Sequence, residues 1–318
     1  MTENPTRPPN LDLGPGKEFD LVRTLLAEWG KSAQRIGDDA AVLDVPAGER
    51  LVVTADTSVE GVHFRREWLS HFEIGYRATA ASLSDLAAMG ARPLGVLIAL
   101  TLPEGDRDAA RSLATGIREG AAAVLSPIVG GDLSSGPVLS LTITALGSVT
   151  RPLTRGGAKI GERVYVTGTL GGPAAALRAW RAGREPTEGD RARFARPVPR
   201  IEAGAVLSAW GATAAIDISD GLIADLRHIA AASKVRIEID VERIPHVAGT
   251  TGVEAASSGE EYEIAVTAAA IDTTLSSEEL GVELTEIGRV VAGPPGVVLL
   301  QNGSPISAPA GFDHFQEK

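Results

Sequence analysis

The chain has 318 residues, a net charge of −11, 44% hydrophobic and 22% charged residues, and no cysteine. This length suffices for two domains, and the composition is typical of a globular rather than a disordered protein. The acidic balance without a basic stripe argues against a nucleic-acid binder, and the lack of cysteine excludes disulfides, thiolate metal sites and a cysteine nucleophile.

Membrane insertion and export are not indicated by the sequence. No apolar run approaches the ~20 residues that a membrane helix needs. The first residues lack the charged-then-apolar pattern of a signal peptide, so we expect a cytoplasmic protein with no membrane partner. Residues 1–16, rich in Pro, Asn and Thr, are predicted to form a mobile tail.

Hydrophobic periodicity predicts an α/β chain in two parts. In the first part, the predicted helices span residues 18–29, 71–89 and 106–124, and the predicted strands span 40–45, 51–55, 94–102 and 138–149. Arg, Pro and Gly cluster at residues 150–161, and we place a domain boundary there. The expected domains are therefore residues 17–150 and 151–318.

The second part continues this alternation. Strands are predicted at residues 163–167, 214–218, 235–241, 262–267 and 283–291, and helices from residue 173, at 201–210 and at 222–232. The arginines between residues 178 and 200 alternate with acids and prolines, which is typical of a solvated helix face.

Aspartates recur beside Gly, Ser or Thr after strand-like runs. They lie in the segments 36–39, 54–57, 129–132 and 216–221, and a further one, Asp85, lies in a helical pattern. Strand ends in α/β folds point to a common edge, where ligands usually bind. Two unit charges 4 Å apart repel by ~4 kcal/mol at an effective dielectric of 20, so convergent carboxylates need cations. Oxygen ligands without soft partners favour Mg²⁺.

Each of these segments also has a purely structural interpretation. Asp beside Gly commonly forms turns, and Asp or Ser before a helix commonly caps it, as Asp220 would for the helix from Leu222. Five such segments in one chain favour a metal site, but their meeting in space does not follow from the sequence.

Two glycine-rich stretches are candidates for phosphate binding. They span residues 130–132 and 168–172, the second directly before a predicted helix. Neither matches a phosphate loop or a complete dinucleotide fingerprint, so each signal is weak alone. His63 is a substrate-binding candidate, although a lone histidine is more often structural. Arg155 and Lys159 can contact phosphate or serve as linker charges, and no nucleophile elbow supports a hydrolase triad.

Eight ordered motifs together resemble one known family. They are residues 37–43 (GDDAAVL), 56–64 (DTSVEGVHF), 83–91 (LSDLAAMGA), 130–132 (GGD), 155–159 (RGGAK), 216–222 (IDISDGL), 258–263 (SGEEYE) and 311–315 (GFDHF). From about Glu18 to Phe315 the chain resembles thiamine-monophosphate kinases, of the superfamily shared with aminoimidazole ribonucleotide synthetase and selenophosphate synthetase.

The resemblance implies a two-domain α/β (α+β) fold of the aminoimidazole ribonucleotide synthetase type, with N-terminal domains paired in a homodimer and the nucleotide between domains. It implies ATP-dependent phosphorylation of thiamine monophosphate to thiamine diphosphate, with several Mg²⁺ ions and ATP as co-substrate. The residues that match the family's Mg²⁺ contacts are Asp39, Thr54, Asp56, Asp85, Asp132, Asp217 and Asp220. Gly131, Asp132, Arg155 and Ser219 match its ATP contacts, and His63, Glu260 and Phe312 match its substrate contacts.

Two positions depart from the family's pattern. Glu261 stands where the family usually has Asp, so its side chain is longer by one CH₂. Ala55 stands where a hydroxyl residue is common, so any metal contact there must come from the backbone.

The expected chemistry needs no general base. The acceptor is a phosphate with a second pKa of ~6, so its oxygen is already anionic at neutral pH. Phosphoryl transfer is mostly alignment and charge neutralisation, and direct in-line transfer is expected. The alternatives are another ATP-using superfamily member, such as a ribonucleotide cyclo-ligase, and a non-catalytic homologue that binds Mg²⁺ and nucleotide.

Overall fold

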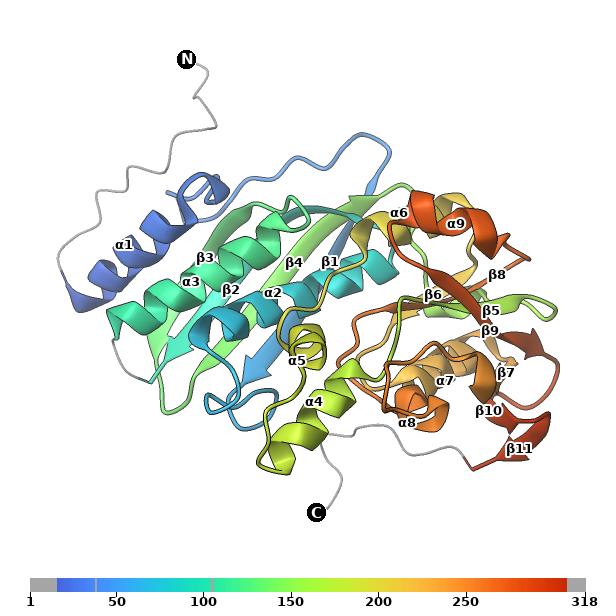
Figure 1. Cartoon of the computed structure of the whole chain (residues 1–318). Coiled ribbons are helices and arrows are strands. Elements are labelled where there is room, and N and C mark those ends of the chain that lie inside the picture. Colours follow the sequence, from blue (N-terminus) through green and yellow to red (C-terminus); the bar gives the residue numbers. More distant parts are fainter. Residues whose placement is uncertain (1–15, 38, 104–105, 308–318) are drawn as a thin grey trace. The chain divides into compact units, whose positions relative to one another are not determined.

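The computed structural model describes residues 16–37, 39–103 and 106–307 (Figure 1). Residues 1–15 of the predicted tail, Asp38 and the predicted substrate contact Phe312 lie outside the described residues. The chain divides into two compact units. Unit 1 comprises residues 1–86 and 92–150, and unit 2 comprises residues 87–91 and 151–318.

Unit 1 is built on a four-stranded sheet in the order β1-β4-β2-β3. The strands are β1 (Arg50–Val59), β2 (Arg92–Leu102), β3 (Ile128–Ser135) and β4 (Ser140–Val149). Its helices are α1 (Lys17–Trp29), α2 (His71–Ala88), whose last two residues belong to unit 2, α3 (Arg107–Ala122) and the short η1 (Gly30–Ser32). β4 runs antiparallel to β1 and β2, whereas β2 and β3 are parallel and are connected through α3.

Helices α2 and α3 lie side by side over one face of this sheet (Figure 1). The hydroxyl of Ser82 on α2 donates to the carbonyl of Ile143 on β4 at 2.9 Å, which ties the helix to the sheet. A Cβ on Gly116 of α3 would lie 1.9 Å from the carbonyl oxygen of Phe72. The two helices therefore approach this closely only because residue 116 is glycine.

Unit 2 contains a seven-stranded sheet in the order β11-β10-β7-β9-β5-β8-β6. The strands are β5 (Arg163–Thr167), β6 (Ala214–Asp217), β7 (Arg236–Asp240), β8 (Ile264–Ala268), β9 (Leu284–Val291), β10 (Gly296–Gln301) and β11 (Ser304–Ile306). The helices are α4 (Gly172–Arg181), α5 (Glu188–Ala195), α6 (Ile201–Ala209), α7 (Leu222–Ser233), α8 (Gly252–Ala256) and α9 (Thr273–Leu280), with the short η2 (Arg155–Gly157) and η3 (Val241–Arg243). Only β7 and β10 pair in parallel.

The core of unit 2 is built from the β-branched and aliphatic residues of its strands, which are buried continuously along β6 and β8 and alternately along β7. Val164 and Val166 of β5 and Ile237 of β7 are fully buried, and they pack with Leu226 of α7 in one apolar cluster. Burial of such side chains supplies the main driving force for folding, at roughly 25 cal/mol per Å² of apolar surface. This core holds β6 and β8 in place. Asp217 is the last residue of β6, and the segment with the candidate Glu260 leads into β8.

Most predicted elements are present, and the mixed α/β class is confirmed. The strand predicted at residues 163–167 coincides with β5. The strand predicted at residues 40–45 is wrong, because this segment pairs with no other strand and the Arg35 side chain donates to the Val42 carbonyl instead. Helix α5 lies within the arginine-rich stretch for which a solvated helix face is expected, and it also buries Phe194.

None of the helices in the described part of the chain combines the length and apolar character needed to cross a bilayer.

Candidate functional site

In unit 1, three predicted metal ligands lie on the side of the sheet that α2 covers. Alternation along β1 turns Thr54 and Asp56 to this side, where both are half-buried, whereas Ala55 faces the other way and is exposed. The Thr54 hydroxyl donates to the carboxylate of Asp85 on α2. Residues 31 positions apart are thus joined, which the sequence could not show.

Asp132 lies on the opposite face of the same sheet. It pairs in register with Ala99 of β2, Ala99 pairs with Thr142 of β4, and Thr142 pairs with Thr57 of β1. Thr57 is the immediate neighbour of Asp56 on the strand, so Asp132 and Asp56 point to different faces. The Asp132 side chain is exposed.

The stretch 130–132 is not a phosphate loop. Gly130, Gly131 and Asp132 lie inside β3 and are paired with β2. A Cβ on Gly131 would lie 2.1 Å from the carbonyl oxygen of Ile98, so the glycine permits close approach of the neighbouring strand. The interpretation of this stretch as a strand-end loop is therefore corrected, although Gly131 and Asp132 stay candidates as individual contacts.

Two further unit 1 candidates lie in irregular segments. Asp39 is exposed in the segment that follows α1 and η1. His63 is half-buried just after β1, and its Nδ1 accepts the backbone N–H of Val59 at 3.1 Å. In the neutral ring the proton is therefore on Nε2, so His63 can act as a donor through that atom.

In unit 2, Asp217 lies at the end of β6, and Ser219 and Asp220 lie in the loop that follows. Asp217 is the last residue of β6 and is buried at 6% exposure, whereas Ser219 and Asp220 are half-buried. One carboxylate oxygen of Asp225 accepts the backbone N–H groups of Ser219 and Asp220 at 3.0 and 3.1 Å. These bonds hold the loop in a single shape at the start of α7.

Asp225 was missed by the sequence reasoning. It is buried at 3% exposure on the first turns of α7. Burial and the nearby Asp220 carboxylate raise the pKa of Asp225 to about 7, against the opposing effect of the backbone N–H groups of residues 219–221. An acid in the first turns of an apolar helix, four residues after the glycine of a Ser-Asp-Gly turn, was the signal that could have revealed it.

The segment Ser258–Glu263 packs directly against this loop. The Glu260 N–H donates to the Ser219 carbonyl at 2.7 Å, and the N–H groups of Glu261 and Tyr262 donate to the Ile218 carbonyl at 3.1 and 2.9 Å. The Tyr262 hydroxyl donates to the Glu260 carboxylate at 2.5 Å. The structure therefore brings together Ser219, Asp220 and Glu260, which were predicted to serve ATP, metal and substrate respectively.

The glycine-rich stretch 168–172 is filled by side chains of the protein itself. The Gly171 N–H donates to the Glu261 carboxylate at 2.6 Å, and the Ala174 N–H donates to the Ser258 hydroxyl at 3.3 Å. The N-terminus of α4 is thus capped by an internal acid, so its interpretation as a phosphate site is replaced. Burial raises the pKa of Glu261 to about 8, although the bonds from Ser258 and Gly171 oppose this.

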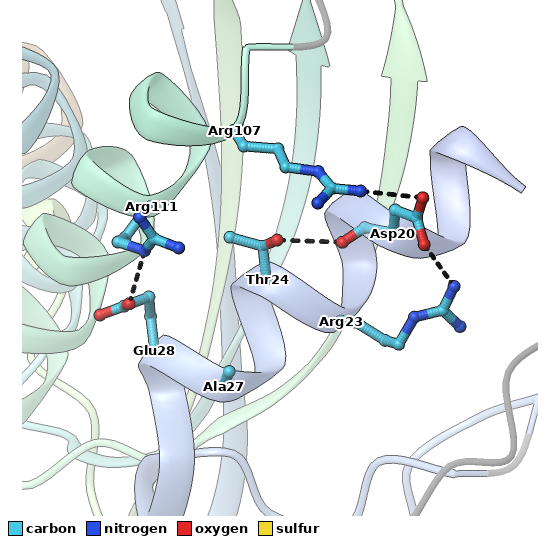
Figure 2. Close-up of a pocket in the computed structure, with 7 residues that line it drawn as sticks. All are labelled: Asp20, Arg23, Thr24, Ala27, Glu28, Arg107 and Arg111. Atoms are coloured by element: carbon cyan, nitrogen blue, oxygen red, sulfur yellow. Dashed lines mark hydrogen bonds and ion pairs between the residues drawn. The ribbon is translucent and has the colours of Figure 1, made fainter.

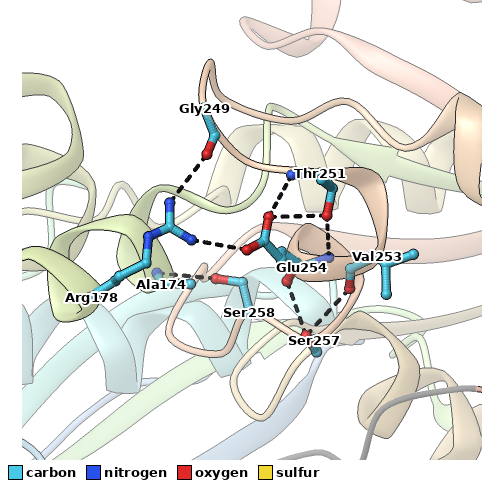
Figure 3. Close-up of polar contacts among 8 residues, drawn as sticks. All are labelled: Ala174, Arg178, Gly249, Thr251, Val253, Glu254, Ser257 and Ser258. Carbon is cyan, nitrogen blue, oxygen red and sulfur yellow. Dashed lines mark hydrogen bonds and ion pairs between the residues drawn. The ribbon is translucent and has the colours of Figure 1, made fainter.

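A further set of contacts involves Arg178, in the later part of α4 (Figure 3). Arg178 forms an ion pair with Glu254 at 3.1 Å and donates to the Gly249 carbonyl at 3.2 Å. Glu254 and Thr251 form a capping box at the start of α8, just before Ser257 and Ser258. These contacts tie α4 to the chain that leads into the Ser258–Glu263 segment.

Arg155 is an exposed residue of η2. Its carbonyl accepts the hydroxyl of Ser233 at 2.8 Å, and a Cβ on Gly157 would lie 1.7 Å from the Thr213 carbonyl oxygen. The backbone of this turn is therefore fixed, while the guanidinium is exposed to solvent and available to an anionic ligand.

The candidate ligands fit a hard cation, but each unit presents them in separate sets. Hydroxyl and carboxylate oxygens are the ligands that Mg²⁺ prefers. Within the described residues, no three His, Cys, Asp or Glu side chains lie close enough together to hold a metal ion. The gathering of all the acids around Mg²⁺ thus stays a prediction.

A surface groove of unit 1 contains none of the candidate residues (Figure 2). It lies between α1 and α3 and is lined by arginines and acids that pair with one another, as Arg107 does with Asp20 at 2.9 Å and Arg111 with Glu28 at 3.1 Å. Its exposed, mutually paired charges indicate a helix–helix contact rather than the functional site.

Comparison with known proteins identifies the family of this chain. Residues 37–149 match the family described as AIR synthase related protein, N-terminal domain, and residues 159–301 match its C-terminal domain. The chain therefore belongs to the AIR synthase-related family. Within that family its relatives are thiamine-monophosphate kinases: the protein of Escherichia coli (strain K12) is 38% identical, over 93% of this chain and 95% of the relative.

Solved structures of thiamine-monophosphate kinases are similar to this chain over nearly its whole length. The crystal structure of thiamine-monophosphate kinase from Stenotrophomonas maltophilia K279a has a TM-score of 0.80 and 39% identity, and the match covers 92% of this chain and 98% of that chain. The structure of "AaThiL complexed with AMPPCP and TMP" has a TM-score of 0.75 and 29% identity, with 96% and 100% covered. The resemblance inferred from the motifs is thereby confirmed.

Proposed function

We propose that this chain transfers the γ-phosphoryl group of ATP to thiamine monophosphate, giving thiamine diphosphate and ADP. The relatives with this activity in their names align over nearly the whole chain. The observation that carries the proposal within this structure is the 2.7 Å bond from the Glu260 N–H to the Ser219 carbonyl. It joins the predicted substrate contact to the loop with the predicted ATP and metal contacts.

The side chains have distinct proposed roles. Several Mg²⁺ ions would be held by the oxygen ligands Asp39, Thr54, Asp56, Asp85, Asp132, Asp217 and Asp220. Bound there, they would neutralise the repulsion between the triphosphate and the acceptor phosphate. Gly131, Arg155 and Ser219 contact ATP, and His63 and Glu260 bind the thiamine phosphate, as does Phe312 beyond the described residues.

No residue of the chain needs to remove a proton from the acceptor. With a second pKa of ~6, the acceptor phosphate is already ionised at neutral pH. The protein therefore has to align two anions and exclude alternative geometries. Glu260, held by the Tyr262 hydroxyl at 2.5 Å, is placed to orient the organic part of the substrate while the exposed guanidinium of Arg155 attracts phosphate.

A turnover assay tests the proposed function. Incubation with ATP, Mg²⁺ and thiamine monophosphate is expected to give thiamine diphosphate and ADP in equal amounts, and chelation of Mg²⁺ by EDTA is expected to stop the reaction. Product analysis by chromatography distinguishes the alternatives. ADP formation only with an amidine ribonucleotide would indicate a cyclo-ligase, and nucleotide binding without turnover would indicate a non-catalytic homologue. Exchange of labelled ADP into ATP without thiamine monophosphate would contradict direct transfer.

We further propose that unit 1 pairs with a second copy of itself. β1 is an edge strand, and Leu51 and Val53 on it are 51% and 55% exposed. Their face continues across the sheet through the half-buried Leu146 and Leu97. An apolar face beside an unpaired strand edge is the type of surface that proteins cover by association.

Replacing Val53 by aspartate tests this pairing. In a dimer the introduced carboxylate would be buried at the interface without a partner, which disfavours association. The variant is therefore expected to be a monomer, with half the solution mass of the dimeric native protein. Analytical ultracentrifugation measures this mass. Val198, with 51% exposure on unit 2, supplies the control: Val198→Asp should leave the mass unchanged. A monomeric native protein, or an unchanged mass in Val53→Asp, would refute the proposed dimer.

A further inference from the structure

The backbone of the segment Ser258–Glu263 adopts a rare conformation. Glu260 has φ 65° and Tyr262 has φ 54°, so two non-glycine residues on either side of Glu261 are left-handed. Such angles persist only where the surroundings impose them, and they collect at functional sites. Glu261 is buried at 7% exposure, whereas its neighbour Glu260 is more exposed and bonded to Tyr262.

The surroundings that impose this conformation are found at the N-terminus of α4. The Glu261 carboxylate accepts the Gly171 N–H at 2.6 Å. The Ser258 hydroxyl accepts the Ala174 N–H at 3.3 Å (Figure 3). The carboxylate is also hydrogen-bonded by Ser258 and lies near Arg193 and Glu263. Glu261 therefore holds the Ser258–Glu263 segment against the N-terminus of α4.

We propose that Glu261 is a positioning residue for substrate binding: the reach of its side chain to Gly171 sets the orientation of Glu260. The proposal rests on the proposed function, since it assumes that Glu260 contacts thiamine monophosphate. It assigns a role to the position at which this chain has Glu in place of the usual Asp.

The length of the side chain matters because the loop opposite has little room to move. A Cβ on Gly171 would lie 2.8 Å from the Thr250 side chain, and a Cβ on Gly172 would lie 2.3 Å from Arg193. Removing one CH₂ withdraws the carboxylate by about 1.5 Å, which breaks a 2.6 Å hydrogen bond unless the segment shifts. Such a shift would turn Glu260.

The nucleotide side of the site is bonded to this segment as well, but it has a second support that does not depend on Glu261. Ser219 and Asp220 are fixed through their own N–H groups by Asp225, at 3.0 and 3.1 Å. Loosening of the Ser258–Glu263 segment therefore affects thiamine monophosphate more than ATP. A general loss of structure would weaken both.

Three substitutions of Glu261 distinguish the effect of its side-chain length from the effect of its charge. Glu261→Gln keeps the length and an acceptor oxygen, and because the pKa of Glu261 is raised to about 8, it resembles the mainly protonated native side chain. We expect its kinetics to stay within about twofold of the native values. Glu261→Asp and Glu261→Ala lose the reach, and we expect the KM for thiamine monophosphate to rise at least about tenfold, with the KM for ATP changed less than about twofold.

Arg181→Ala is the matched control, because Arg181 is an exposed residue in the last turn of the same helix, away from its N-terminus. Its KM values should match the native ones. Calorimetric binding of thiamine monophosphate and of ATP, with thermal melting, accompanies the kinetics. Native kinetics in Glu261→Asp, impairment in Glu261→Gln alone, or equal weakening of both ligands would each overturn the proposal. Absence of turnover in the native protein would instead refute the proposed function.

Discussion

Replacing Asp132 by asparagine is expected to lower kcat about a thousandfold, which corresponds to about 4 kcal/mol of transition-state stabilisation. The same result is expected for Asp39→Asn. Asparagine keeps the shape of the side chain but removes the negative charge that would hold Mg²⁺ against the phosphates of ATP. Steady-state rates with saturating ATP, Mg²⁺ and thiamine monophosphate measure the effect.

The fold of both variants should be preserved, because both aspartates are exposed. Exposed substitutions of this kind usually change stability by less than about 0.5 kcal/mol, so melting temperatures should match that of the native protein. Asp108 provides the control: its side chain is 90% exposed on α3 and pairs only with surface charge, so Asp108→Asn should turn over at the native rate. Near-native rates in both Asp39→Asn and Asp132→Asn would remove these residues from the metal site.

Replacing Arg200 by alanine is expected to destabilise the protein by about 3 kcal/mol. The guanidinium donates to both carboxylate oxygens of Glu263, at 2.8 and 2.5 Å, and the Glu263 side chain is only 5% exposed. Without Arg200 the buried carboxylate loses both guanidinium hydrogen bonds and keeps the one from the Thr167 hydroxyl at 2.6 Å. A loss of this size corresponds to a fall of about 6–12 °C in melting temperature, measurable by circular dichroism.

Two comparisons isolate the buried charge as the cause. Arg243 forms an exposed ion pair with Glu286 at 3.1 Å, so Arg243→Ala should cost less than about 1 kcal/mol. Combining Arg200→Ala with Glu263→Gln removes the uncompensated charge and should recover part of the lost stability. If Arg200→Ala melts like Arg243→Ala, Glu263 does not depend on this ion pair.

Local sequence patterns were sufficient to predict a helix or strand where its own residues determine it. The β-branched run at β5 and the apolar periodicity of α2 and α7 predicted those elements to within a few residues. The pattern at residues 40–45 failed because alternation alone does not provide a neighbouring strand. A strand needs partners for its N–H and C=O groups, and these partners come from distant parts of the chain.

The sequence supplied the candidate residues of the site but not their geometry. The structure brings Ser219 and Glu260 together and joins Thr54 to Asp85. However, Asp56 and Asp132 lie within strands rather than after them, on opposite faces of one sheet. Asp225 escaped notice because an acid on a helix is usually solvated, and only its burial shows what it holds.

The sequence by itself determined the residue types on which the proposed chemistry depends: the oxygen ligands proposed for Mg²⁺, the absence of thiols and the ordered motifs. Only the tertiary structure decided which backbone groups are already hydrogen-bonded or packed within the protein. Gly171 offers its N–H to Glu261 rather than to a phosphate, and Gly131 makes room for β2 rather than for a ligand. The physical reason is that a glycine or an acid is chemically the same in a turn, a strand or a core, and its partner is set by chain segments far away in sequence.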